Sequence, residues 1–209
     1  MKLRALAVFS LLTLCSSAQA FEIETLLDNG DAANRIDVLI LGDGYRTEDQ
    51  AKMSSDAAAF LAEYWAASPN GEYQGVYNVY LVHVVSNQNG ADNGTYGTTR
   101  DTALGATFNC YNIDRLLCVD DSAVYQTAAA HVPTWDQILV MVNDPKYGGS
   151  GGNISVFSTN ALAGQIAIHE LGHSFGGLAD EYEDAYPGYP ECGADCPEPN
   201  ATNHTSLET

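Results

Sequence analysis

Runs of apolar and β-branched residues predict the strands of a sheet that is covered on both faces. The run 36–41 is almost continuously apolar, and the runs 76–85 and 137–142 have a similar character. Strands with apolar side chains at successive positions are typical of a sheet between two layers of helices. A shorter run of alternating polarity occupies 153–158. The pattern therefore predicts an α/β fold with a mixed β-sheet packed against helices.

A turn and a helix follow the first predicted strand. Gly42 and Asp43 begin a glycine-rich turn. The spacing of Thr47 and Gln50 is that of a capping box, which predicts a helix over about 48–66. Asp43 stands at the carboxyl end of a buried strand, where ligand sites form in open sheets. Aspartate in such a turn more often stabilises the turn through a local Asx hydrogen bond, and we expect that role here.

An uncharged stretch predicts a buried helix later in the chain. No charged residue occurs over 160–168, and Ile166 lies on the helical stripe that continues to His169 and His173. A helix that is apolar nearly all round is a core helix. Burial of two histidines and the intervening Glu170 is costly unless a partner compensates them, and a divalent metal ion is such a partner.

The sequence His169-Glu170-Leu171-Gly172-His173 has the spacing of a zinc site. Residues four apart lie on one face of an α-helix, so both imidazoles can reach one metal ion. The carboxylate of Glu170 projects toward the open metal position, where it can take a proton from water. Three fixed residues also arise by chance, and the alternative is a core helix whose histidines are satisfied by hydrogen bonds.

The third protein ligand is expected just after this helix. Gly176 and Gly177 permit a left-handed turn that ends the helix and reverses the chain. Leu178 is expected to anchor that turn in the core, so that either Asp180 or Glu181 returns to the metal. We favour Asp180, one position beyond the third ligand of the metzincin pattern, because its short side chain suits a backbone close to the metal. Glu181 is the alternative.

The segment HELGHSFGGLADEY at 169–182 resembles the active-site segment of the IgA-peptidase family of secreted bacterial zinc metallopeptidases. Residues 36–45 and 138–151 are similar to two strands of that family with the turn or glycine loop after each. The resemblance implies a zincin-like catalytic domain that hydrolyses peptide bonds, and it implies no particular substrate. In such enzymes an edge strand above the metal often pairs with the substrate. The run 153–158 is our candidate, with a plain strand as an equal alternative.

The beginning of the chain has the pattern of a secretory signal peptide. Lys2 and Arg4 precede an apolar run, and small residues over 17–20 suit a cleavage site. The predicted organisation is a signal peptide over 1–20 and one metallopeptidase catalytic domain over 21–209, which we expect to be truncated at its C-terminus. No other apolar run is long enough to span a bilayer. These features predict a secreted protein, extracellular or periplasmic.

Charge argues against two classes of partner. The chain has 8 basic and 27 acidic residues, a formal net charge of −19. This balance disfavours nucleic acid and anionic membranes, so we expect a protein or peptide substrate. Nothing in the sequence specifies an oligomeric state.

Export would make disulfides the default state of the remaining cysteines. Local bridges from Cys110 to Cys118 and from Cys192 to Cys196 are the simplest pairing, with half a zinc knuckle as the alternative for the second pair. His83 alternates with apolar residues, so we expect it to be satisfied inside the fold.

Two polar insertions, 86–99 and 109–121, are of the kind that lines clefts or binds ions. A calcium site at Asp120 and Asp121 is one hypothesis for the second insertion. His131 is isolated in the sequence and receives no predicted role.

Two functions follow from these patterns. The main hypothesis is a secreted zinc metallopeptidase, with His169, His173 and Asp180 as ligands of Zn²⁺ and Glu170 as general base. The alternative is a non-catalytic surface-binding module with a structural metal, which the acidity and the polar insertions would suit. Glu170 favours the enzyme, because a structural site needs no carboxylate at that position.

Overall fold

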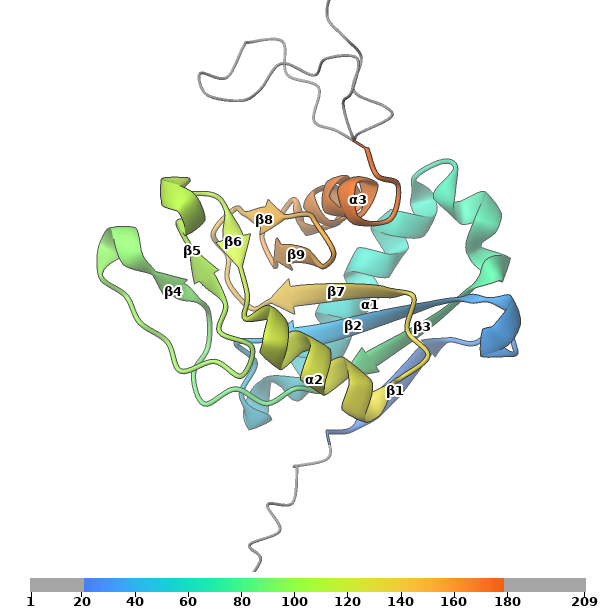
Figure 1. The fold of residues 1–209 in the computed structure, drawn as a ribbon, viewed down its shortest axis with the longest axis horizontal. Coiled ribbons are helices and arrows are strands. Elements are labelled where there is room, and N and C mark those ends of the chain that lie inside the picture. The colour runs from blue at the N-terminus through green and yellow to red at the C-terminus, as the bar shows by residue number, and fades with distance from the viewer. Residues whose placement is uncertain (1–20, 179–209) are drawn as a thin grey trace, which may run out of the picture.

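A six-stranded mixed sheet in the order β1-β3-β2-β7-β9-β8 forms the centre of the fold (Figure 1). It is seen in a computed structural model that describes residues 21–178. The four strands β3, β2, β7 and β9 are parallel, and β1 and β8 run antiparallel to their neighbours at the two ends of the order. The strands are β1 (Ile23–Leu27), β2 (Ile36–Asp43), β3 (Tyr77–Val82), β7 (Gln137–Val142), β8 (Gly149–Ser150) and β9 (Ser155–Ser158).

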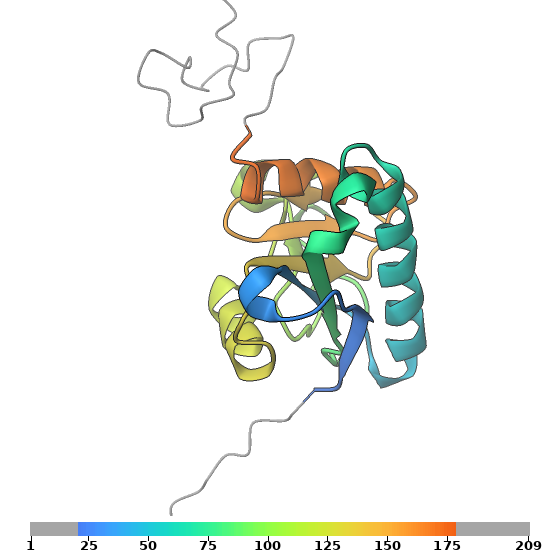
Figure 2. The same cartoon turned by 90° about the vertical axis from the view of Figure 1, so that its right-hand side faces the viewer.

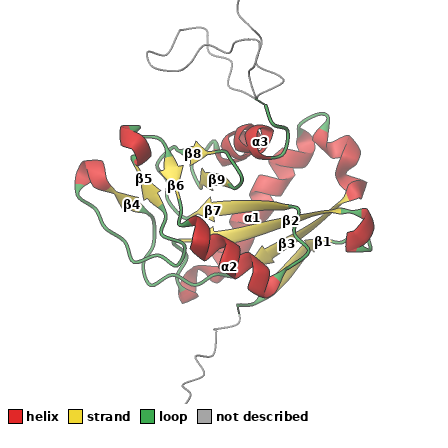
Figure 3. Ribbon diagram, viewed as in Figure 1, coloured by secondary structure: helices red, strands yellow, loops and turns green. Residues whose placement is uncertain are grey.

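Helices cover both faces of this sheet (Figure 2). Helices α1 (Gln50–Ala66) and α3 (Ala163–Ser174) pack on one face, and α2 (Asp121–His131) packs on the other. A three-stranded sheet in the order β4-β5-β6 lies beside β8 (Figure 3). Its strands are β4 (Asp92–Asn93), β5 (Thr107–Phe108) and β6 (Leu117–Cys118). The 3-10 turns are Ala32–Asn34, Thr47–Asp49, Asn70–Val76, Gly94–Tyr96 and Cys110–Asn112.

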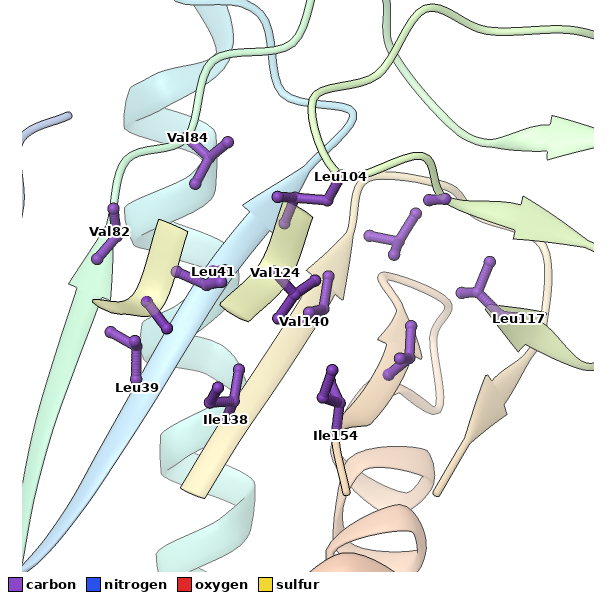
Figure 4. Close-up of a cluster of buried hydrophobic side chains, with 14 of the residues drawn as sticks. Leu39, Leu41, Val82, Val84, Leu104, Leu117, Val124, Ile138, Val140 and Ile154 are labelled. Carbon is purple, nitrogen blue, oxygen red and sulfur yellow. The ribbon is translucent and has the colours of Figure 1, made fainter. Parts of the chain in front are cut away.

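Side chains along β2 point alternately to the two faces of the sheet and so contribute to two separate cores. Leu39 and Leu41 belong to the core under α2, whereas Ile40 belongs to the core under α1 and α3. Side chains of a strand point to opposite faces in turn, and all three of these are fully buried. Figure 4 shows the first core, in which Val124 of α2 lies among the side chains of β2 and β7. The predicted α/β fold with helices on both faces is confirmed.

The helices differ from prediction at their beginnings. Thr47 lies in a 3-10 turn, and α1 begins at Gln50. The carboxylate of Asp49 accepts a hydrogen bond from Arg46 N at 3.1 Å, which caps the 3-10 turn before α1. The capping box predicted from Thr47 and Gln50 is therefore wrong. Helix α2 was not predicted. Asp120 at its N-terminus accepts hydrogen bonds from two backbone N–H groups, which is a capping role. The calcium site at Asp120 and Asp121 stays a hypothesis.

Two histidines hold the first described residues to the fold. His83 Nδ1 lies 3.0 Å from Gln50 Oε1 and His83 Nε2 lies 2.9 Å from Glu24 Oε2, so the prediction of a satisfied histidine is confirmed. His131 Nε2 accepts a hydrogen bond from Phe21 N at 2.9 Å, and the two rings stack. No local pattern indicates this second role, since Phe21 and His131 are 110 positions apart.

Asp43 is a completely buried anchor for the first polar insertion. Its carboxylate accepts hydrogen bonds from Ser86 Oγ at 2.9 Å, Leu104 N at 3.1 Å and Ala106 N at 2.9 Å. Its role is structural, but the partners lie between 43 and 63 positions away, in place of the expected local Asx bond. This carboxylate therefore connects the end of β2 to the segment that leads into β5.

No helix within residues 21–178 combines the length and apolar character needed to cross a membrane. The predicted signal peptide over 1–20, the candidate ligands Asp180 and Glu181, and the pair Cys192 and Cys196 all lie outside the described residues.

Candidate active site

Helix α3 brings His169, Glu170 and His173 together at one point. One potential ligand atom from each residue lies within 4.8 Å of the others, and this is the one such group of metal-binding side chains within residues 21–178. The two Nε2 atoms of His169 and His173 are 3.2 Å apart. The side-chain cluster predicted from the motif is therefore present in the structure.

The separation of the two imidazoles fits two ligands of one tetrahedral metal ion. Zinc–nitrogen bonds of about 2.0–2.1 Å would place the two nitrogens about 3.3–3.4 Å apart. His173 Nδ1 lies 2.7 Å from Leu178 O, so Nδ1–H donates to this carbonyl and Nε2 presents its lone pair. The chemistry of this donor set thus suits zinc.

The loop around β8 packs its glycines directly against the site. A Cβ atom at Gly149 would come within 2.7 Å of Glu170 Oε1, and a Cβ atom at Gly151 would come within 2.6 Å of His173 Cβ. Glycine is therefore required by close approach at both positions. Glu170 itself is only 7% exposed, so this backbone restricts the directions in which its carboxylate can point.

A cleft of about 320 Å³ is lined by His169 and Glu170 of the cluster. Arg115 and Tyr147 join the α3 side chains in its lining, although sequence reasoning gave neither a role. The signal for Arg115 was its position in the insertion 109–121, which was expected to line a cleft. Residues that line it include Arg115, Tyr147, Leu162, Ile166, His169 and Glu170.

The strand that precedes α3 is not an edge strand. Strand β9 pairs with β7 on one side and with β8 on the other, so the proposed edge role of 153–158 is wrong. The short β8 lies outside it, and Gly149 N donates a hydrogen bond to Arg115 O at 3.3 Å. Strand β8 takes this outer position because the second insertion folds back onto it, so that Leu116 pairs with Gly149.

The end of α3 partly matches its prediction. Gly177 has a φ of 60°, the left-handed turn expected from the paired glycines. Leu178 is 45% exposed, so its predicted anchoring in the core is wrong. It supports the site through its carbonyl group, which holds His173. Phe175 and His169 are also exposed, so α3 is buried on one face and not all round.

One predicted disulfide is present next to the cleft. Cys110 and Cys118 are bonded to each other. Their loop contains Asp114, whose Oδ1 accepts a hydrogen bond from Lys146 Nζ at 2.8 Å. These links fasten the loop that carries Arg115 over the cleft.

If the cluster on α3 is a hydrolytic centre with Glu170 as its base, replacing Gly149 with alanine is expected to lower kcat/KM by about tenfold to a hundredfold. The new methyl group would displace the Glu170 carboxylate, and a misplacement of about 1 Å at a catalytic group has an effect of this size. Gly75→Ala is the matched control, since no atom lies within 4 Å of its Cβ position. Equal activity of the two variants would contradict the positioning role of Gly149.

Comparison with known proteins places the chain in a family. A search of curated proteins gave no match. A comparison with protein families matches residues 24–209 to the family described as IgA Peptidase M64. The matched range contains the whole sheet apart from Ile23, the cleft and the cluster on α3. The chain therefore belongs to the IgA peptidase M64 family.

Proposed function

We propose that this protein is a secreted zinc metallopeptidase with a zincin-like catalytic domain. The observation that carries the proposal is the convergence of His169 Nε2 and His173 Nε2 beside the buried carboxylate of Glu170. Membership of a peptidase family supports hydrolysis of peptide bonds. Strand β8 lies at the end of the sheet order, runs antiparallel to β9 and packs against α3 through Gly149, and this arrangement supports the zincin-like assignment.

Different residues of the chain bind the metal ion, transfer the proton and orient a ligand in the proposed reaction. His169, His173 and Asp180 would hold the metal ion. Bound zinc supplies a Lewis acid that lowers the pKa of water and polarises a carbonyl group. Glu170 accepts a proton from the attacking water and then donates it to the departing amine nitrogen. The Leu178 carbonyl keeps the proton of His173 on Nδ1, which leaves Nε2 to face the metal.

Secretion and domain organisation form part of the same proposal. Residues 1–20 act as a signal peptide and 21–209 as the catalytic domain. The disulfide between Cys110 and Cys118 supports export, because such bonds persist in oxidising compartments. The burial of Glu170 beside the histidines argues against a purely structural metal site, which would use no carboxylate at that position.

Metal dependence tests the proposal and the third ligand together. The purified protein is expected to bind one zinc ion per chain and to hydrolyse a peptide library only with that zinc bound. In competition against a chelator, Asp180→Ala should weaken zinc affinity by at least about tenfold and abolish hydrolysis, because a direct ligand is lost. Glu181→Ala is the matched variant and should retain its zinc.

Two outcomes would count against this assignment. Well under one zinc per folded chain, or hydrolysis that survives complete metal removal, would refute the zinc peptidase itself. A weaker zinc affinity in Glu181→Ala than in Asp180→Ala would instead transfer the ligand role to Glu181.

A further inference from the structure

The last turn of helix α3 is joined to strand β9 by a pair of serine hydroxyl groups. Ser155 Oγ and Ser174 Oγ lie 2.5 Å apart, which makes them hydrogen-bond partners. Ser155 is the first residue of β9, and Ser174 is the last residue of α3. Ser174 directly follows His173, the second histidine of the cluster. The pair therefore joins the sheet to the helix at the residue next to a proposed metal ligand.

The side chain of Ser155 occupies a position at which the core favours an apolar residue. Alternation along β9 directs Ser155 to the same face of the sheet as Phe157, which belongs to the core under α1 and α3. Ser155 is completely buried, and burial of a hydroxyl group costs free energy unless a hydrogen bond compensates it. The bond to Ser174 supplies that compensation. Alanine would fill nearly the same space without this cost, so the hydroxyl group indicates a role in holding α3.

A second serine of the same strand lacks this bond. Ser158 is also completely buried, and alternation directs it to the opposite face, toward the core that contains Val156. Among the partners available within residues 21–178, its Oγ makes no hydrogen bond. The two serines share strand, size and burial, and they differ in the bond to α3. Ser158 is therefore a matched reference for the function of Ser155.

Other contacts of the last turn orient the imidazole ring of His173. A Cβ atom at Gly151 would come within 2.8 Å of His173 Cδ2, so the backbone just before β9 packs closely on the ring. His173 Nδ1 lies 2.7 Å from Leu178 O, in the chain that follows α3. The hydroxyl pair adds a directional bond to β9, a strand that pairs with β7 on one side and β8 on the other. The end of α3 is thereby held to a strand inside the sheet.

We infer that Ser155 is a positioning residue for His173 and acts through Ser174. This inference rests on the proposed zinc site. The Nε2 atoms of His169 and His173 are 3.2 Å apart, a separation that fits two ligands of one tetrahedral ion. His169 lies one turn earlier in α3, so a shift of the last turn alone would change this separation. Loss of a contact that holds a metal ligand in place typically weakens metal affinity by about 10–100-fold.

Zinc affinity of the full chain, measured by competition against a chelator, tests this inference. Ser155→Ala is expected to weaken zinc affinity by about tenfold, because the last turn of α3 loses its bond to the sheet. Ser158→Ala is the matched control, and it should keep the wild-type affinity within about twofold because it removes a hydroxyl group that has no partner among the described residues. Equal zinc affinities of the two variants would overturn the inference.

A double variant separates positioning from general stability. Ser174→Ala leaves the buried hydroxyl group of Ser155 without its partner, whereas replacing both serines with alanine removes the unpaired group as well. In urea unfolding of the metal-free protein, the double variant should therefore have a higher midpoint than Ser174→Ala. Zinc affinity should stay about tenfold below the wild type in both, because both lack the bond to β9. Recovery of zinc affinity together with stability in the double variant would indicate a merely structural role and overturn the inference.

The same measurements distinguish the inference from the proposed function. Failure of the wild type to bind zinc would refute the proposed zinc site, and the positioning role with it. Zinc binding by the wild type without peptide hydrolysis would refute only the peptidase, and the affinities of the serine variants would still decide the inference. An active peptidase that binds zinc equally well with and without the Ser155 hydroxyl group would overturn the inference alone.

Discussion

Glu170→Gln is expected to lower kcat/KM on peptide substrates by about 10²–10⁴-fold while the zinc content stays at one ion per chain. Glutamine has nearly the same shape, so it fills the space beneath Gly149 without a new clash. Its amide cannot accept the proton of the attacking water, and the loss of a general base has an effect of this size. Steady-state kinetics and metal analysis on the same preparation measure both quantities.

Glu63→Gln provides the matched control for this substitution. Glu63 belongs to α1 and contacts α3 at Gly164, but it does not line the cleft. Its amide variant should keep kcat/KM within about twofold of the wild type, because only the carboxylate in the cleft takes part in proton transfer. A wild-type value of kcat/KM in Glu170→Gln would refute the role of Glu170 as general base.

Asp43→Ala is expected to lower the free energy of unfolding by about 3–5 kcal/mol. Truncation removes the Asp43 acceptor of Ser86 Oγ and Leu104 N and one of the two acceptors of Ala106 N, which also donates to Thr102 Oγ1. Each buried donor left without a partner costs about 1–3 kcal/mol. Urea unfolding, followed by far-UV circular dichroism, gives this difference.

Asp120→Ala is the control for Asp43→Ala. Asp120 also accepts hydrogen bonds from two backbone N–H groups, but at the solvent-exposed start of α2. Loss of such a cap typically costs about 1 kcal/mol. If the two variants were equally stable, the buried bonds of Asp43 would not be the anchor that their geometry suggests.

The Asp43 substitution should also impair the site at a distance. Ala106, one of its partners, directly precedes β5, and Phe108 of β5 packs closely on Gly148. A Cβ at Gly148 would come within 2.6 Å of Phe108 Cε1, so little space separates the two segments. Loosening of the first insertion would therefore reach the glycine loop that holds Glu170.

Local periodicity was sufficient to predict the central strands. The run 137–142 corresponds to β7 residue for residue, and the five positions after Gln137 are all buried in one of the two cores. Helix α2 was not predicted because few of its residues are apolar and buried. It is largely composed of alanine and polar residues, and only Val124 and Ala128 are buried, so it lacks a strong apolar stripe.

The site was predictable only where its geometry is local. His169, Glu170 and His173 are brought together by the pitch of one helix, which the sequence spacing encodes directly. Arg115 and Gly149 reach the same place through the pairing of Leu116 with Gly149, 33 positions away, which no local pattern reveals. The edge role of 153–158 failed for this reason, because strand order depends on distant partners.

The contact between Phe21 and His131 has a consequence for maturation. Removal of residues 1–20, as we propose, would convert the Phe21 amide into a free α-amino group. Its nitrogen already faces the lone pair of His131 Nε2, because His131 Nδ1 is directed to Thr127 O at 2.8 Å. It would also stand near the carboxyl end of α2, where the helix dipole favours a positive charge by about 0.3–1 kcal/mol. The docking place of the new terminus is thus built into the fold, and processing itself would stabilise the mature enzyme.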